Sequence, residues 1–208
     1  MTNHVGISLG WNCNSAMLGI RMGIRGEKSN GYKTCPFDAC ITNYDGMVLC
    51  IRENFKYFCD SQYLHIIEAH VDSGGIKKGE KIIYNSRYNF IFNHESPGHA
   101  DLYIIENWAT GMNHYVDNDF FFFKERYNRR IENYLHYTNY MNNHFVKFIL
   151  TRINRDISSL YNTIREIYPC LGFEIIILVP TDSKELIRKH LEFAQLSSEM
   201  ITYELTNK

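Results

Sequence analysis

The sequence has 208 residues, of which 45% are hydrophobic and 22% are charged, and its formal net charge is −1. This length suits a single domain over residues 1–208 that buries a sizeable core. A charge so close to zero offers no field to recruit nucleic acid or an anionic membrane. No apolar stretch reaches the roughly 20 residues that a membrane helix needs. We therefore expect a globular protein that binds neither nucleic acid nor membrane, and its oligomeric state stays open.

Six cysteines are present, and no two of them have Cys-x-x-Cys spacing, which argues against a zinc ribbon. A chain of this length does not need disulfides, and its first residues lack the pattern of a secretory signal. We expect free thiols and a cytoplasmic location.

The first unusual feature is the stretch 5–25, in which the apolar pattern changes from strand-like to helix-like across Gly10. A short apolar run predicts a strand over 4–9, and the later apolar spacing predicts a helix over 14–25. Cys13 falls in the turn between them. There it lies close to the first free N–H groups of a helix, whose partial positive charge favours a thiolate over a thiol. A buried structural cysteine in a turn is an equally common alternative.

The rest of the chain becomes more regular toward its end. Apolar spacing and turn residues predict the following elements: a helix over 45–58, a short strand over 88–92, a helix over 120–141, a strand over 145–150, a helix over 157–168, a strand over 173–179, a helix over 183–194 and a strand over 200–205. Alternating strands and helices at this spacing imply right-handed crossovers and a parallel sheet. We therefore predict a three-layer, Rossmann-like α/β fold, in which residues 60–120 form a partly irregular lid or insertion.

In an open parallel sheet, ligands bind beyond the carboxyl ends of the strands. Asn12, Cys13 and Asn14 follow the first predicted strand. Arg152 follows the strand over 145–150, and Thr181 follows the strand over 173–179. We expect these side chains to share one edge of the sheet and to form a small polar site.

A cysteine nucleophile needs a base within hydrogen-bond reach and often an acid or amide that orients the base. The candidate bases are His94 and His99, and the candidate orienting acids are Asp38 and Asp101. Their spacing does not place them near Cys13, and a surface or structural role is the more common one for a single histidine. Two histidines five residues apart in a Pro-Gly loop are not a strong metal-ligand pattern, so we expect no metal and no cofactor.

Two non-hydrolytic alternatives remain. Arg25, Arg152 and either Arg129 or Arg130 could hold a phosphorylated ligand or a nucleotide-sugar, as in glycan synthesis, with Cys13 as a packing residue. Adjacent helical positions point about 100° apart, so only one of Arg129 and Arg130 can face a given ligand. The other alternative is a non-catalytic interaction protein, which would expose an apolar patch.

Several short motifs occur in a fixed order along roughly residues 5–180: Ile7-Ser8-Leu9-Gly10 followed by Cys13, Ile24-Arg25, Pro36-Phe37-Asp38, Tyr88 with Phe92 and His94, Tyr127 with Arg129-Arg130-Ile131-Glu132, and Phe148-Ile149-Leu150-Thr151-Arg152. Together they resemble the putative papain-like cysteine peptidase family, whose function is unknown and whose members occur in bacteria and large DNA viruses. Glu95 stands where that family tends to have Asp, and Asn133-Tyr134 replaces its Arg-Phe.

The resemblance implies a thiol hydrolase with Cys13 as nucleophile and His94 as base. On this hypothesis, Asp38 orients the imidazole or stabilises its charge, and the N–H groups of Cys13 and Asn14 form an oxyanion pocket. The substrate would be a peptide, or a small amide or ester. If the protein is viral, the resemblance implies the host cytoplasm.

Overall fold

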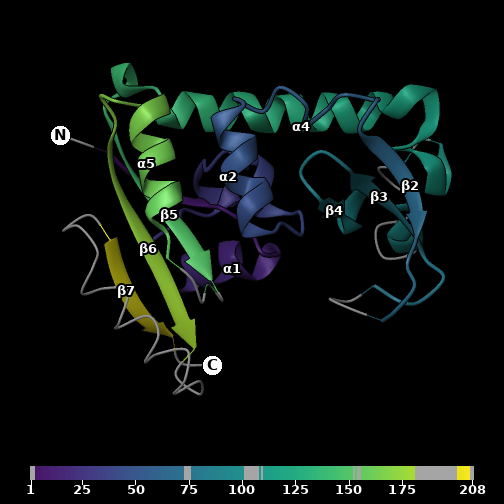
Figure 1. The fold of residues 1–208 in the computed structure, drawn as a ribbon, viewed down its shortest axis with the longest axis horizontal. Helices are drawn as coiled ribbons and strands as arrows, with labels where there is room; N and C mark the ends of the chain where they lie inside the picture. The colour runs from purple at the N-terminus through teal and green to yellow at the C-terminus, as the bar shows by residue number, and fades with distance from the viewer. Residues whose placement is uncertain are drawn as a thin grey trace.

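The structure is a computed structural model that describes residues 3–72, 76–100, 108, 110–151, 153, 156–180 and 201–206. The larger of its two sheets has the strand order β1-β5-β6-β7, and all three pairings are parallel (Figure 1). Its strands are β1 (Asn3–Ser8), β5 (His144–Thr151), β6 (Gly172–Pro180) and β7 (Ile201–Thr206). The four strands predicted at these places are confirmed. β6 was the clearest in the sequence, because a strand that is buried on both faces has a nearly continuous apolar run.

The described helices are α1 (Cys13–Arg21), α2 (Tyr44–Arg52), α4 (Asp117–Thr138) and α5 (Ser158–Ile167). Each coincides with a predicted helix, although α1 and α2 end earlier than expected. Just after the end of α1, Gly23 has a φ of 69°, a left-handed conformation that glycine adopts without strain. The helix predicted over 183–194 lies outside the described residues. None of the described helices is long and apolar enough to cross a membrane.

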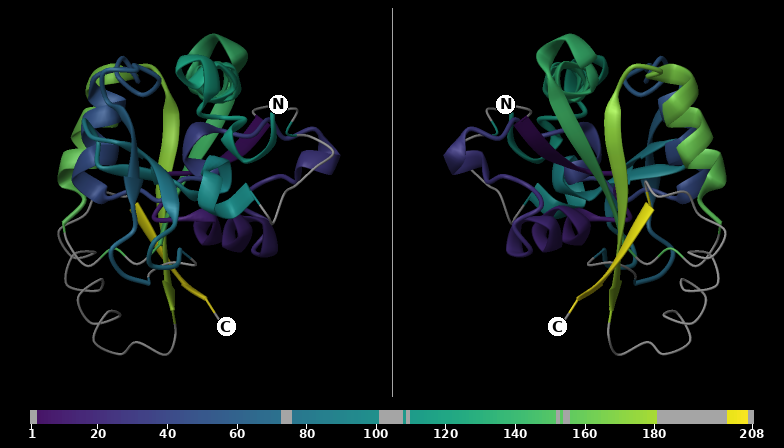
Figure 2. Two further views of the ribbon diagram at one scale, coloured as in Figure 1. Left: turned by 90° about the vertical axis from the view of Figure 1, so that its right-hand side faces the viewer. Right: turned by 90° about the vertical axis from the view of Figure 1, so that its left-hand side faces the viewer.

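Both faces of the larger sheet are covered (Figure 2). Ile149 and Ile176 pack in one cluster with Leu18 of α1 and with Met22, which directly follows α1. Neighbouring strand residues such as Ile175 point the other way and join the main core, to which α2 and α5 contribute. This alternation follows from the two-residue period of a strand. The mixed α/β class with a parallel sheet is confirmed.

The finer prediction of a Rossmann-like three-layer sheet is not confirmed. The described strands follow one another in chain order across the sheet, without the reversal of order that a doubly wound sheet requires. The connection from β1 to β5 is also far longer than a single crossover helix, since it contains α1, α2, α4 and the second sheet.

Residues 60–120, predicted as a partly irregular insertion, contain a regular antiparallel sheet with the order β2-β3-β4. Its strands are β2 (Leu64–Glu68), β3 (Lys81–Asn85) and β4 (Phe90–Phe92). The sequence indicated only β4, through the aromatic residues Tyr88, Phe90 and Phe92. β2 and β3 have five residues each and lack such an aromatic run, so their alternation is too short to recognise. The action of this segment as a lid stays a prediction, and so does the single-domain assignment.

Aromatic side chains join the second sheet to α4. Phe92 of β4 packs against Phe123 and Tyr127 of α4, with ring centroids 4.8 and 5.0 Å apart, and against Phe58 at 5.5 Å. These four rings belong to the same core cluster as the strands of the larger sheet. The aromatic core therefore fixes α4 and the second sheet against each other, which positions the segment after β4 that contains His94.

Candidate functional site

The turn after β1 carries Cys13 as the first residue of α1. Gly10 and Trp11 in this turn have φ values of 96° and 80°, so a bulky residue holds a left-handed conformation two positions before the cysteine. Asn12 caps the helix, because its Oδ1 accepts the N–H of Asn14 at 2.9 Å. The Cys13 thiol is free and half-buried. The turn therefore presents a thiol at the amino end of a helix, as the sequence predicted.

Thr42 fixes the strained turn from outside. The Trp11 N–H donates to Thr42 Oγ1 at 2.8 Å, and the Thr42 N–H donates to the Trp11 carbonyl at 3.3 Å. Gly10 lies so close to Thr42 that an added Cβ would collide with the threonine side chain. Glycine is therefore required at position 10 both by its φ and by this contact.

A serine pair supports the same turn from inside. Ser8 and Ser15 are fully buried, and their hydroxyl groups form a short hydrogen bond with each other. Ser15 Oγ also lies 3.2 Å from the Asn12 carbonyl, and the Gly10 N–H donates to Ser8 Oγ at 3.2 Å. These bonds satisfy polar groups that the turn removes from water.

Residues 41 and 42 connect this turn to β4. Ile41, next to Thr42, exchanges two backbone hydrogen bonds with Ile91, at 2.8 and 3.0 Å. His94 follows three residues later in the helical turn Asn93–Glu95. The candidate nucleophile and the candidate base thus lie on two segments that flank residues 41 and 42 on opposite sides.

The structure records no hydrogen bond between the Cys13 thiol and the His94 imidazole, both of which lie among the described residues. In the described part of the chain, Cys13 Sγ forms no hydrogen bond, whether to His94 or to another group. Their pairing as nucleophile and base therefore stays a prediction.

His94 itself is half-buried, and its burial lowers the pKa of the imidazole. The charges of Arg126 and Arg130 and of His99 lower this pKa further, whereas Glu95 opposes them. The imidazole is therefore uncharged at neutral pH, which is the form that accepts a proton. His99, the other candidate base, is buried with its Nδ1 3.6 Å from Glu80 Oε2.

The carboxyl group beside His94 is buried and forms two ion pairs. Glu95 is fully buried, and its Oε1 accepts from Arg126 Nη1 at 2.9 Å and from Arg130 Nη1 at 3.3 Å. Its Oε2 accepts the Tyr127 hydroxyl at 3.0 Å. In the sequence, Glu95 stands out only as a change from the family pattern. The four-residue spacing of Arg126 and Arg130, which puts both on one helix face, was the signal that could have revealed this cluster.

Asp38 forms a second buried ion pair. Its Oδ2 lies 2.7 Å from Arg25 Nη2 and accepts the Cys35 N–H at 2.8 Å, and the Arg25 guanidinium lies over the Tyr32 ring at 3.9 Å. Burial raises the pKa of Asp38, although Arg25 opposes this shift. Since this carboxylate is engaged by Arg25, its predicted role in orienting His94 stays a prediction.

The remaining predicted residues have mixed outcomes. Arg152, Thr181 and Asp101 lie outside the described residues. Arg25 and Arg130, the predicted anion anchors, are paired with carboxylates of the chain itself. The anion-binding alternative therefore gains no support from them and stays a prediction.

The carboxyl ends of β1 and β5 enclose a hollow of about 20 Å³, lined by Trp11, Thr42 and Thr151 among others. This is room for about one water molecule. The Thr151 hydroxyl is buried there and has no hydrogen-bond partner among the residues that the structure describes. Among the described residues, no three His, Cys, Asp or Glu side chains gather as a metal site would require.

The fold and the site define an α/β protein with a half-buried thiol at a helix start beyond the first strand of a parallel sheet. The sequence model of the putative papain-like cysteine peptidase family matches residues 4–182, and the chain belongs to this family. The resemblance found in the sequence is thereby confirmed. No curated protein and no solved structure matches the chain.

We predict that Gly10→Ala destabilises the protein more than Gly31→Ala does. Both glycines have a positive φ, but an added Cβ has open space at Gly31 and collides with Thr42 at Gly10. Gly31→Ala should cost about 1–2 kcal/mol from backbone strain alone, and Gly10→Ala should cost clearly more. Urea unfolding of both variants measures the difference. Equal costs would contradict the packing assigned to Thr42.

We predict that Glu95→Gln lowers the free energy of unfolding by about 3–5 kcal/mol, because two guanidinium groups lose their buried counter-charge. Glu53→Gln, which breaks the more exposed pair with Arg87, should cost at most about 1 kcal/mol. Chemical denaturation of both variants at pH 7 tests this, and similar costs for the two would show that the Glu95 cluster adds no more stability than the exposed pair.

The lowered pKa of His94 predicts a pH dependence of stability. In the window between the ordinary histidine pKa of about 6.5 and the lower pKa of folded His94, the unfolded chain binds more protons than the folded chain. Stability should therefore fall as the pH falls through this window. His94→Asn should flatten the slope in part, since burial also lowers the pKa of His114 and His144. An unchanged slope in denaturant titrations between pH 5 and 7 would contradict this assignment.

Proposed function

We propose that the protein is a thiol hydrolase that cleaves a peptide, amide or ester bond through an acyl-thioester on Cys13. The observation that carries this proposal is the position of Cys13, a half-buried free thiol at the amino end of α1 in a member of the putative papain-like cysteine peptidase family. A cysteine in that position benefits from the partial positive charge of the helix start.

The other cysteines are poor candidates for a nucleophile. Cys35, Cys40 and Cys50 are fully buried, and burial raises the pKa of each thiol. Burial also raises the pKa of Cys59 to about 12. Cys170 is exposed, but it precedes β6 and thus lies at the amino end of the parallel strands. Ligands of open parallel sheets bind at the opposite edge, which favours Cys13.

His94 is the base in this proposal, because its lowered pKa keeps the imidazole uncharged at neutral pH. The backbones of Trp11 and Ile91 are separated by the residue 41–42 segment, which corresponds to two strand spacings, or about 10 Å. Catalysis requires the thiol and the imidazole to approach each other when substrate binds. Catalytic hydrogen bonds are often long in ligand-free enzymes and tighten only in the complex.

The reaction follows from these roles. The imidazole takes the thiol proton, the Cys13 sulfur attacks the carbonyl carbon, and the imidazolium returns the proton to the departing amine or alcohol. Water, deprotonated by the same imidazole, then attacks the thioester and releases a carboxylic acid with the free thiol. Because Asn12 already engages the Asn14 N–H, the Cys13 N–H is the member of the predicted pair that would bind the oxyanion.

The proposed compartment is the cytoplasm, because all six cysteines are free, as expected where thiols stay reduced. In this proposal the substrate is a peptide or a small molecule that carries an acyl group.

We predict that p-nitrophenyl acetate gives a burst of p-nitrophenol and leaves an acetyl group on Cys13, detected by mass spectrometry of the digested protein. Cys13→Ala should abolish the burst. His94→Asn should slow the acylation by about 10²-fold to 10⁴-fold, the usual contribution of a general base.

Cys170→Ala is the matched control, since it removes an exposed thiol from the other end of the sheet and should leave the burst unchanged. A burst that survives in Cys13→Ala and disappears in Cys170→Ala would overturn the proposal. Equal rates for wild type and His94→Asn would remove His94 from the base role.

A further inference from the structure

Two large apolar side chains are exposed beside the candidate nucleophile. Trp11, two residues before Cys13, has 44% of its surface exposed, and Met17, four residues after Cys13, has 46%. Single exposed apolar residues are common on protein surfaces. Two of them within four residues of a candidate nucleophile form a surface that a substrate at this thiol would meet.

The backbone holds Trp11 in this exposed place at a cost. Its φ of 80° is a left-handed conformation that is strained in a bulky residue. Thr42 fixes this conformation through hydrogen bonds to both the N–H and the carbonyl of Trp11. Strain of this kind persists only where the surrounding structure imposes it, and it is concentrated at active sites and ligand contacts. A tryptophan that is both strained and exposed therefore points to a ligand on its indole ring.

Met17 extends this surface along α1. Four helical positions correspond to a rotation of about 400°, so Cys13 and Met17 lie on one face of the helix, about 6 Å apart along its axis. The buried residues of α1 are Ser15, Ala16 and Gly19, which lie on its other side. Long side chains on a helix lean toward its N-terminus, so we expect Met17 to lean toward the thiol.

Size and charge restrict the group that this surface can bind. The hollow that Trp11 lines takes about one water molecule, so a chain attached to Cys13 stays outside it. There, Trp11 and Met17 are the exposed large apolar side chains nearest to the thiol in the sequence. The sequence from Val5 to Ile20 contains no Asp, Glu, Lys or Arg. This segment cannot neutralise a charged chain, whereas it can cover an apolar one.

We propose that Trp11 and Met17 bind the acyl part of the substrate, and that this part is an uncharged apolar chain of about six carbon atoms, enough to cover one helical turn. This acyl specificity rests on the hydrolase function proposed above and defines its substrate class. The chain packs against the indole of Trp11 and the thioether of Met17, and its carbonyl carbon meets the Cys13 sulfur. Attack by the sulfur then releases the alcohol or amine, as described above.

The test compares p-nitrophenyl hexanoate with p-nitrophenyl acetate, which share a leaving group and differ in chain length. The rate constant for acylation of Cys13 in the full chain is divided by that of the same ester with glutathione, which removes the difference in intrinsic reactivity. The corrected rate should be about tenfold higher for the hexanoate, since burial of about two methylene groups is worth roughly that factor. Mass spectrometry of the digested protein assigns the acyl group to Cys13.

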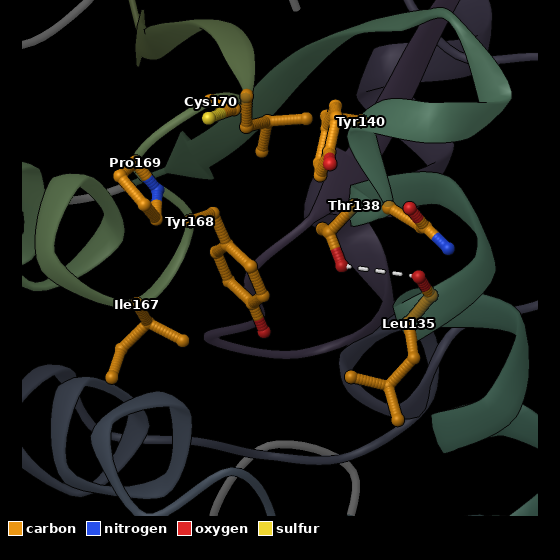
Figure 3. Close-up of a pocket in the computed structure, with 9 residues that line it drawn as sticks. Leu135, Thr138, Tyr140, Ile167, Tyr168, Pro169 and Cys170 are labelled. Carbon is orange, nitrogen blue, oxygen red and sulfur yellow. Dashed lines mark hydrogen bonds between the residues drawn. The ribbon is translucent and has the colours of Figure 1, made fainter.

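Four variants locate the effect. Trp11→Ala and Met17→Ala should each lower the corrected preference for the hexanoate several-fold. Tyr140→Ala and Met141→Ala are the matched controls, because they remove an exposed aromatic residue and an exposed methionine just before β5, at the amino edge of the sheet. Tyr140 lines a separate apolar cavity of about 280 Å³ there, shown in Figure 3. Both controls should keep the preference.

The outcomes separate the acyl specificity from the hydrolase function. Equal corrected rates for the two esters in the wild-type chain, or a preference that Trp11→Ala and Met17→Ala both retain, would overturn the specificity and leave the hydrolase function intact. Acylation of Cys13 by neither ester would overturn the hydrolase function. N-hexyliodoacetamide and iodoacetamide then decide the role of the apolar surface, since both alkylate a thiol without a hydrolytic step. A tenfold corrected preference for the hexyl reagent at Cys13 supports that surface, and equal corrected rates overturn it.

Discussion

The buried carboxylate of Glu95 is the constraint on which the candidate site depends. A charge removed from water is tolerated only when it is paired and hydrogen-bonded, and Arg126, Arg130 and Tyr127 meet that requirement from one face of α4. The ion pairs hold α4 against the segment after β4. His94 precedes this carboxylate by one residue, so the pairing that stabilises Glu95 also sets the backbone that carries the candidate base.

The candidate nucleophile, Cys13, is positioned by a strained turn rather than by an ion pair. The turn before Cys13 holds Trp11 in a left-handed conformation, and this strain persists because Thr42 bonds to both backbone groups of the tryptophan. The pairing of Ile41 with Ile91 then connects the turn to the second sheet. The two candidate catalytic groups therefore come from different sheets and are coupled through one short segment.

The two edges of the larger sheet have different chemistry, and the parallel arrangement is the reason. α1 begins beyond the carboxyl edge and presents free N–H groups there, which favour anions and developing negative charge. α5 ends at the amino edge, where Tyr168, Pro169 and Leu171 enclose an apolar cavity without charged side chains. The two edges therefore differ in the charge that they favour.

The sequence by itself determined the features that depend on local periodicity. It predicted the parallel strands, the described helices and the place of Cys13 at the junction of a strand and a helix, because these patterns repeat within a few residues. Only the tertiary structure decided the partners of the charged residues. Glu95 meets Arg130 across 35 positions, and Asp38 meets Arg25 across 13. Such pairings depend on how segments that are distant in the sequence pack together, so no local pattern of residues encodes them. Once the fold buries these charges, each of them requires its partner.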